Sequence, residues 1–455
     1  MNVRPNNMTK PFSQDIKDLS IHKLQYNFRQ QTFTALDATN FCLKKIQANN
    51  KHLNAFITIT ENDARIAAEA SDNRRRNGRT LGALDGIPIA IKDNINLKGT
   101  ATTNGIGAYR GGIAKEDANI IKKIKNAGGI ILGKTNMDEA ALGASNRNHA
   151  YGFCQNPHKT NYTSGGSSGG SAVAVAAGLC TAAIGSDTLG SIRIPASFCG
   201  VLGLKPSYNS INTNGIIELY KPLDHIGPFA NNPEDLLTIL EIITDTNMKS
   251  EPVQKQLTDY RIGFIKDINT VYSENLDPEV FDFYSALKKN LIKSGHHISD
   301  VNWDHIENSV VLPKAILLIE VALAKKYKKK LTEYPDGFSS EIKAAINFGL
   351  DQDTVAIRQA RKTITNVKEI IKKALYNYDL LITPTTLAPA FPLNKKMPRN
   401  ITSFTAFANY TGYPALSVPV GKTKNGLPMG FQIIGKPECD REIIRFSSEV
   451  LSQAH

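Results

Sequence analysis

At its centre the chain reads SGGSSGGS (residues 164–171), then AVAVAAG (172–178) and, two residues later, TAAIGSD (181–187). The glycines and serines predict a loop, the alanine-rich run predicts a buried helix, and the run after it predicts a strand. Neither apolar run is long enough to cross a bilayer. A loop, a buried helix and a strand in this order indicate one unit of an α/β fold.

The same alternation continues on both sides of this stretch. Upstream, we predict helices over 33–48, 61–77 and 117–126, and strands over 87–92 and 129–133. Downstream, we predict helices over 278–293, 313–330 and 353–376, and strands over 261–265, near 298, over 380–383 and over 415–420. The polar stretch 244–257 is interpreted as a linker or long loop. The strands after it are too few for a separate core, so we expect one large domain over 1–455 with a largely parallel or mixed sheet.

The composition is typical of a soluble globular protein, with 41% apolar and 21% charged residues. The N-terminus has no apolar segment of the kind found in secretory signals. Five cysteines without a CxxC pair favour reduced thiols over disulfides, and nine histidines without an HExxH motif give no metal-ligand spacing. We therefore expect a cytoplasmic protein without metal, cofactor or membrane contact.

The formal net charge is +12, with basic clusters at 74–79 and 325–330. Such clusters can attract nucleic acid. No zinc finger, RNP motif or aromatic-interleaved basic stripe accompanies them, so we interpret them as solvated helix faces. Nucleic acid is expected only indirectly, through a tRNA-linked assembly, and the oligomeric state is left open, a homodimer included.

Gly128, Gly133, Lys134 and Thr135 match the phosphate-binding pattern GxxxxGK(S/T). In a true phosphate-binding loop the intervening residues form a turn after a strand. Here they are Gly-Ile-Ile-Leu, which is itself a strand pattern, and the segment before them has a helical pattern. We therefore reject nucleotide binding at this position.

Three segments carry residues suited to nucleophilic chemistry. Lys92 ends an apolar strand within GIPIAIKDN (86–94), Ser167 lies in the Gly/Ser loop, and Ser191 lies in GSDTLGSIRIPA (185–196). Taken singly, a lysine at a strand end is usually solvated and a Gly/Ser run is usually a flexible loop. A serine nucleophile, however, needs a base within hydrogen-bond reach, and no histidine lies near these segments.

A lysine can act as that base if burial favours its neutral form, and the isoleucines on either side of Ala90 would provide such burial. A second serine between the lysine and the nucleophile can relay the proton, which gives a Ser-Ser-Lys variant of the catalytic triad. Glycines around both serines allow backbone amides to approach a reacting carbonyl and form an oxyanion hole.

In this order and spacing, the three segments resemble the amidase signature family. GGSSGGS (165–171), GSIR (190–193) and IAIKDN (89–94) are similar to the family's motifs, at separations of 75 residues between Lys92 and Ser167 and 24 between Ser167 and Ser191. The close match covers about 81–207 and continues weakly to 415. The resemblance implies that Ser191 attacks an amide carbonyl, that Ser167 follows a cis peptide bond, and that Lys92 moves protons through Ser167. It also implies an α/β/α layered single domain around a large mixed sheet, in which 258–455 complete the sheet and pocket.

One position departs from the family's pattern, because Leu189 stands where the family's DTGGS turn has its first glycine. The resemblance implies an oxyanion hole built from the backbone of Thr188, Leu189, Gly190 and Ser191. If position 189 required a positive φ, a leucine would be strained there. If not, Leu189 narrows the pocket and favours a small or apolar acyl group, and we expect this second outcome because Gly190 is retained.

Further roles are expected for residues around the three motifs. Asp187 and Arg193 are expected to anchor the turn by hydrogen bonds. Met137, Tyr162 and Ser168 are candidates for substrate contact, and the segments 137–144 and 383–389 are expected to line the pocket.

The segment KTNMDE (134–139) resembles the A subunit of glutamyl-tRNA amidotransferase, a glutaminase. We expect that similarity mainly over the signature core. The glutamine-binding arginine of that enzyme falls on Ala344 or Ala345, and its aspartate is missing from 401–407. Because glutamine would bind poorly without these charges, we favour a stand-alone amidase that releases acid and ammonia. The alternatives are an inactive scaffold, a ureide-cleaving relative and the glutaminase subunit.

Overall fold

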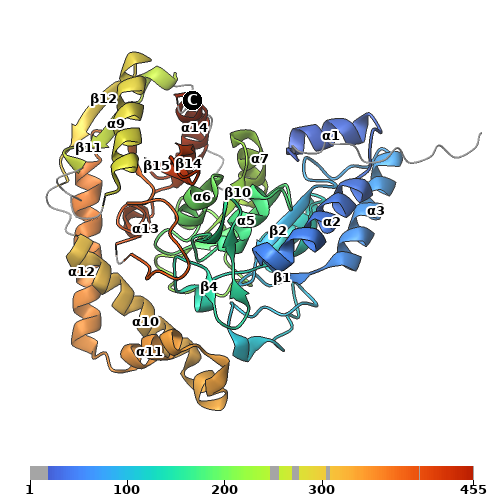
Figure 1. The fold of residues 1–455 in the computed structure, drawn as a ribbon, viewed down its shortest axis with the longest axis horizontal. Coiled ribbons are helices and arrows are strands. Elements are labelled where there is room, and N and C mark those ends of the chain that lie inside the picture. Colours follow the sequence, from blue (N-terminus) through green and yellow to red (C-terminus); the bar gives the residue numbers. More distant parts are fainter. Residues whose placement is uncertain (1–18, 246–255, 269–275, 304–307, 399, 454–455) are drawn as a thin grey trace, which may run out of the picture.

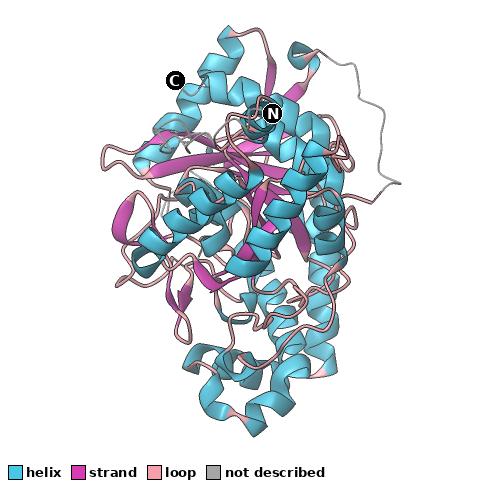
Figure 2. Cartoon of the chain, turned by 90° about the vertical axis from the view of Figure 1, so that its right-hand side faces the viewer, coloured by secondary structure: helices cyan, strands magenta, loops and turns pink. Residues whose placement is uncertain are grey.

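The computed structural model describes residues 19–245, 256–268, 276–303, 308–398 and 400–453, and these residues build an α/β fold around one large sheet (Figure 1). Eleven strands from these ranges pair in the order β1 (Phe56–Ile59), β3 (Ile130–Thr135), β2 (Pro88–Lys92), β8 (Ala182–Asp187), β10 (His225–Ala230), β9 (Leu202–Lys205), β14 (Ala415–Lys422), β15 (Pro428–Gly435), β13 (Leu380–Pro384), β11 (Arg261–Ile265) and β12 (His297–Val301). Helices flank this sheet (Figure 2). The predicted fold class is confirmed.

The sheet is mixed. Strands β3, β2 and β8 are parallel neighbours, as are β12, β11 and β13, while the strands between these two groups pair antiparallel. Two small hairpins lie outside the sheet, β4 (Arg147–Asn148) with β5 (Gly152–Phe153) and β6 (Gln155–Asn156) with β7 (Lys159–Thr163). The parallel groups need crossover connections, which the helices supply.

The helices cover the sheet and extend beyond it. They are α1 (Ile21–Arg29), α2 (Ala35–Leu53), α3 (Glu61–Arg76), α4 (Asn119–Asn126), α5 (Gly169–Ala176), α6 (Arg193–Cys199), α7 (Pro233–Ile243), α9 (Pro278–Lys293), α10 (Asn308–Glu333), α11 (Ser340–Leu350), α12 (Thr354–Ala374), α13 (Ala406–Thr411) and α14 (Asp440–Gln453). Helices α10, α11 and α12 pack on one another at the lower left of Figure 1. The helix α5 and strand β8 correspond to the central stretch from which the fold was predicted.

Most predicted elements are found within a few residues of the predicted bounds. No bounds were predicted for several others, among them β1, β9, β10, β15, α1, α6, α7, α11, α13 and α14. Pro428 and Gly430 weigh against a strand in sequence terms, yet β15 pairs with β14 on one side and β13 on the other. Pro428 is tolerated because it is the first residue of the strand. The predicted linker 244–257 falls mostly on 246–255, outside the described residues.

The residues that match the phosphate-binding pattern form strand β3 from Ile130 onward, as predicted when nucleotide binding was rejected. Lys134 is buried, and its Nζ lies 3.1 Å from Oδ1 of Asp93 and 3.2 Å from the carbonyl oxygen of Ala101. The lysine is therefore an internal partner of Asp93, and the strand leaves no turn whose amides could surround a phosphate.

Candidate active site

The sheet brings Lys92 and the turn after β8 to the same edge. Strands β2 and β8 are parallel neighbours with Ile91 opposite Ile184, so their carboxyl ends coincide. Lys92 is the last residue of β2, and the turn that contains Ser191 runs from the end of β8 to α6. The Gly/Ser loop before α5 lies against the same edge, because the backbone amide of Ser168 donates to the carbonyl oxygen of Ser191 at 3.1 Å. Three segments far apart in sequence therefore meet.

Lys92 and Ser167 are in direct contact. The Nζ atom of Lys92 lies 2.7 Å from Oγ of Ser167, and both side chains are fully buried. The peptide bond between Gly166 and Ser167 is cis, as the resemblance implied. Gly166 is required here because a Cβ atom at this position would lie 1.9 Å from Oδ2 of Asp138.

Burial lowers the pKa of Lys92 to about 7. Desolvation disfavours the ammonium form, and the nearby carboxylates of Asp138, Asp224 and Asp187 oppose it only partly. A substantial fraction of Lys92 is therefore a neutral amine near neutral pH. Only this form has the lone pair that can accept a proton from Ser167.

Of the three predicted catalytic residues, Ser191 is the one that lines a cavity. It is 8% exposed and lines a cavity of 580 Å³, while Ser167 and Lys92 lie behind it in the protein interior. The arrangement thus presents one hydroxyl to a ligand and keeps the serine–lysine pair away from bulk water.

The turn around Ser191 is held by a buried carboxylate. Asp187 accepts hydrogen bonds from the backbone amides of Gly190 at 2.7 Å and Ile192 at 3.1 Å. The Gly190 amide, which the predicted oxyanion hole included, is therefore already donated to Asp187. The oxyanion hole at this turn stays a prediction.

Asp187 and Arg193 form a buried bidentate pair. Nε and Nη2 of Arg193 lie 3.0 and 2.9 Å from the two oxygens of Asp187. Burial alone would raise the pKa of Asp187, but the guanidinium of Arg193 outweighs it and holds that pKa below its ordinary value. The pair occupies the supporting position that the sequence predicted for it.

The C-terminal half completes this support with residues that sequence reasoning missed. Nη1 of Arg193 donates to the carbonyl oxygen of Thr405 at 2.7 Å and to Oε1 of Gln432 at 2.9 Å, and Nη2 donates to Oδ1 of Asn409 at 2.7 Å. The hydroxyl of Thr405 donates to the carbonyl oxygen of Leu189 at 2.6 Å. No local motif marks these three residues, because their partners lie more than 200 positions away in sequence.

Replacing Arg193 by methionine is expected to lower the free energy of unfolding by about 3–5 kcal/mol, because Asp187 would remain buried without its counter-charge. Urea denaturation measures this change. Arg261→Met is the matched control: Arg261 also forms a bidentate pair, with Asp379, but is largely exposed, so little change is expected. Equal effects of the two substitutions would contradict the supporting role of Arg193.

Leu189 is unstrained. It is not among the described residues with positive φ, whereas Gly190 has a φ of 130°. Its side chain is 7% exposed and lines the 580 Å³ cavity. Position 189 therefore accommodates a side chain without a positive φ. That Leu189 narrows the pocket for the acyl group stays a prediction.

The cavity beside Ser191 is mainly apolar. Its wall combines the segment 138–145 with residues from α10, α11 and the loop before α13. Its apolar side chains include Leu189, Ile194, Leu219, Leu312, Ile316, Ile319, Leu393, Met397 and Ile401. The acidic and basic side chains of its lining are Asp138, Glu139, Arg147, His149 and Glu341.

The three candidates for substrate contact are not among the residues that line the cavity, whereas the predicted segment 137–144 does line it from Asp138 onward. Met137 is fully buried in the main hydrophobic core, and Tyr162 packs beside Phe391, with Nζ of Lys159 4.4 Å from the centre of its ring. The Ser168 hydroxyl donates to the carbonyl oxygen of Ser186 at 3.0 Å. The cavity lining includes no residue of the predicted segment 383–389, but it does include Leu393, Met397, Ile401 and Thr402 from farther along the chain.

Two buried carboxylates near Lys92 were not predicted. Asp138 accepts from the backbone amides of Ser145 and Arg147, each at 3.2 Å, and Asp224 accepts from the amide of Leu219 at 2.6 Å and from the Thr188 hydroxyl. Burial raises the pKa of each carboxyl to about 6. Asp224 therefore ties the turn before Ser191 to the cavity wall at Leu219.

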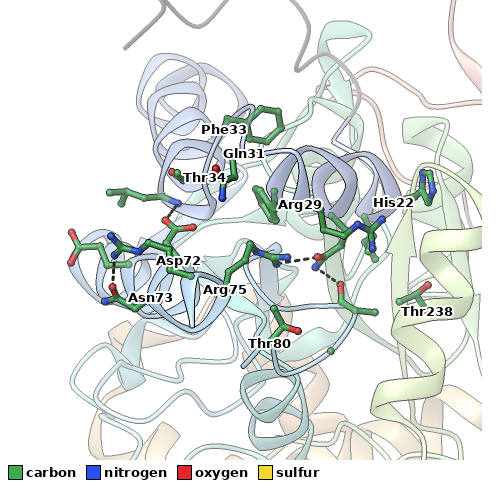
Figure 3. A pocket seen from close by; sticks show the side chains of 18 of the residues that line it. His22, Arg29, Gln31, Phe33, Thr34, Asp72, Asn73, Arg75, Thr80 and Thr238 are labelled. Atoms are coloured by element: carbon green, nitrogen blue, oxygen red, sulfur yellow. Dashed lines mark hydrogen bonds between the residues drawn. The ribbon is translucent and has the colours of Figure 1, made fainter. Parts of the chain in front are cut away.

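A second cavity, of 1320 Å³, lies far from this chemistry between α1, α3 and α7 (Figure 3). His22 and Arg29 from α1, Asp72 and Arg75 from α3, and Thr238 from α7 surround it. Its polar groups are used within the protein: Nη2 of Arg75 donates to Gln25 at 3.0 Å, and Asp72 accepts from the first amides of α2. The cavity beside Ser191 is therefore the candidate active site.

In the described residues, no helix is long and apolar enough to cross a membrane, and no group of three or more histidine, cysteine, aspartate or glutamate residues could hold a metal ion.

Comparisons with known proteins agree with this geometry. The family model "Amidase" matches residues 37–444, so the chain belongs to the amidase family, whose members are hydrolases that act on C–N bonds. The A subunit of the glutamyl-tRNA(Gln) amidotransferase of Koribacter versatilis is 34% identical to it, over 96% of this chain and 98% of the relative. A crystal structure of an amidase superposes with a TM-score of 0.87 at 28% identity, covering 95% of this chain and 99% of that one. The structure of the glutamyl-tRNA(Gln) amidotransferase A subunit from Thermotoga maritima superposes with a TM-score of 0.76 at 27% identity. The superposition covers 96% of this chain and 94% of that one.

These comparisons correct one expectation. The similarity to the amidotransferase was expected mainly over the signature core, but it extends over nearly the whole chain. The motifs of the core stand out in the sequence because the chemistry fixes side chains there, whereas the remaining similarity lies in positions that only a full comparison detects.

Proposed function

We propose that this chain hydrolyses the amide of a carboxylic acid with an apolar acyl group, releasing the acid and ammonia. The observation that carries the proposal is the 2.7 Å contact between the buried amine of Lys92 and the hydroxyl of Ser167. The next residue, Ser168, donates its backbone amide to the carbonyl oxygen of Ser191, which lines the mainly apolar cavity. This supports a serine nucleophile whose proton is removed by a lysine through a second serine.

In the proposed reaction, Oγ of Ser191 attacks the amide carbon, its proton moves to Ser167, and the Ser167 proton moves to Nζ of Lys92. Backbone amides of the turn 188–191 stabilise the oxyanion. The C–N bond then breaks as the proton returns from Lys92 through Ser167 to the nitrogen, which leaves as ammonia. Water hydrolyses the resulting ester at Ser191 by the same proton route and frees the acid.

The lining of the cavity supports an apolar acyl group. Leu189 lies two residues before the proposed nucleophile, and Ile316 and Ile319 of α10 line the same cavity. An amino acid such as glutamine would need a cation for its carboxylate and an anion for its amine. Arg147 lines the cavity, but its Nη2 atom is already within hydrogen-bond distance of the carbonyl oxygens of Pro392 and Lys395.

Replacing Leu189 by glycine is expected to change acyl selectivity. The ratio of kcat/KM for a branched or aromatic amide to that for acetamide should rise about 10-fold or more, because several apolar carbons leave the pocket beside the nucleophile. A general loss of activity from a more flexible turn affects both amides and leaves this ratio unchanged. The ratio for Leu189→Ala should lie between those of the wild type and the glycine variant. An unchanged ratio in both variants would remove Leu189 from the specificity pocket.

A second candidate function is the glutaminase activity of an amidotransferase A subunit. It is favoured by the relative of that name, which is 34% identical over nearly its whole length. In that case the chain would act on glutamine and depend on partner subunits and tRNA. The positions predicted for the glutamine-binding charges argue against it, since alanine stands at both 344 and 345 and the segment 401–407 contains no acidic residue.

A panel of amides separates the two candidates. The purified chain is tested for ammonia release from glutamine, asparagine and a series of aliphatic and aromatic amides, with Ser191→Ala as the control. Release from apolar amides but not from glutamine, abolished in the control, is the expected result. Glutamine-specific release, or activity that requires partner subunits and tRNA, would replace the first candidate with the second.

A further inference from the structure

The amine of Lys92 lies between two hydroxyls. Its Nζ atom is 2.7 Å from Oγ of Ser167 and 2.8 Å from Oγ of Ser186, a residue of β8 that is only 6% exposed. The carbonyl oxygen of Ser186 is farther away, at 3.5 Å. The lysine is thus held from two sides, although only the Ser167 side leads to the nucleophile.

Ser186 is itself fixed in place. Nδ2 of Asn94 donates to Oγ of Ser186 at 3.1 Å and to the carbonyl oxygen of Ile217 at 3.2 Å. The backbone of Ser186 is held by Ser168, whose hydroxyl accepts from its amide at 3.2 Å and donates to its carbonyl oxygen at 3.0 Å. The hydroxyl that faces Lys92 is therefore anchored through both its side chain and its backbone.

We propose that Ser186 is a positioning residue for Lys92: its hydroxyl accepts a hydrogen bond from Nζ and thereby directs the lone pair of the amine at Ser167. The inference rests on the proposed Ser-Ser-Lys reaction and adds a fourth residue to it. A neutral amine has two protons and one lone pair. If one N–H of the amine donates a hydrogen bond to Oγ of Ser186, rotation about the Cε–Nζ bond is restricted. The lone pair can then face Ser167.

The same hydroxyl serves the protonated state. When Lys92 has taken the proton, its ammonium group donates to both hydroxyls, and the hydrogen bond to Ser186 strengthens because its donor is charged. Ser186 therefore favours the ammonium form of Lys92, whereas burial opposes it. The other charged groups that act on Lys92 are Asp138, Asp187 and Asp224.

The test is the rate at which a fluorophosphonate labels Ser191, measured from pH 5 to 9 in the full chain. For Ser186→Ala we expect a plateau about 10- to 100-fold lower, because the lone pair of Lys92 is no longer directed. We also expect the acidic limb of the profile to move to lower pH, since the ammonium has lost a partner. A smaller folded fraction would lower the plateau without moving the limb.

Two further variants keep the test specific. Ser186→Thr retains the hydroxyl and should restore most of the plateau. Ser171→Ala removes another buried hydroxyl from the same region, where Ser171 lies 2.7 Å from Oγ1 of Thr135 and has no contact with Lys92 among the hydrogen bonds of the described residues, and it should leave the profile unchanged.

The outcomes separate the two proposals. If the wild-type chain is not labelled at Ser191, the proposed function fails. If the wild type is labelled normally, and Ser186→Ala has a plateau within twofold of it and the same limb, the positioning role of Ser186 is overturned while the proposed function stands.

Discussion

Replacing Ser191 by alanine is expected to reduce amide hydrolysis by about 10⁴-fold or more, because the covalent route is lost with the hydroxyl. Ser191 is the only one of the three predicted catalytic residues that lines the cavity, so neither Ser167 nor Lys92 can replace it as nucleophile. Steady-state ammonia release on an apolar amide measures the loss. The KM of any residual activity should change little, since the cavity wall is intact.

A matched serine makes this result interpretable. Ser171→Ala removes a buried hydroxyl from the same glycine–serine motif but leaves the cavity untouched, and it should keep activity within a few-fold of the wild type. Mass spectrometry after fluorophosphonate treatment should locate the label on Ser191 alone. A label on another residue, or full activity of Ser191→Ala, would refute the assignment of the nucleophile.

Replacing Lys92 by methionine is expected to lower kcat by about 10²- to 10⁴-fold, the range that a positioned general base contributes. Methionine fills a similar volume without an amine, so the buried site keeps its packing. The free energy of unfolding should therefore fall far less than activity does, and chemical denaturation checks this. Lys45→Met, which removes a half-buried lysine bound to the carbonyl oxygen of Ala177, is the control and should remain active.

The pH dependence of the wild type gives the same assignment independently. The reaction needs the neutral amine of Lys92, whose pKa burial lowers to about 7. Activity should therefore fall as the pH drops through about 7, where the amine becomes protonated, and should reach a plateau above it. A flat profile between pH 5.5 and 8 would exclude Lys92 as the base.

The three proposed catalytic residues could be found from sequence because each belongs to a short motif with strict local requirements. The close approach of Asp138 requires glycine at 166, and the turn after β8 requires Gly190 at a φ of 130°. Such requirements leave a readable pattern. The alternation of helix and strand likewise follows from local periodicity, and it led to the correct fold class.

Residues that act through long-range contacts left no such pattern. Asn409 and Gln432 meet Arg193 only because β15 and α13 are brought beside α6. The strand β15 itself was missed because Pro428 and Gly430 weaken its local signal, while its position between β14 and β13 stabilises it. For the same reason the candidates for substrate contact at Met137, Tyr162 and Ser168 are not among the residues that line the cavity.

The sequence by itself therefore determined the family, the fold class and the chemistry available at Lys92, Ser167 and Ser191, because backbone geometry and side-chain type constrain these positions locally. Only the tertiary structure decided which residues surround them. The burial that lowers the pKa of Lys92, the second hydroxyl at Ser186 and the apolar wall from α10 all arise from segments that approach one another in space. Desolvation and contact are properties of the packed chain, and no local pattern of residues encodes them.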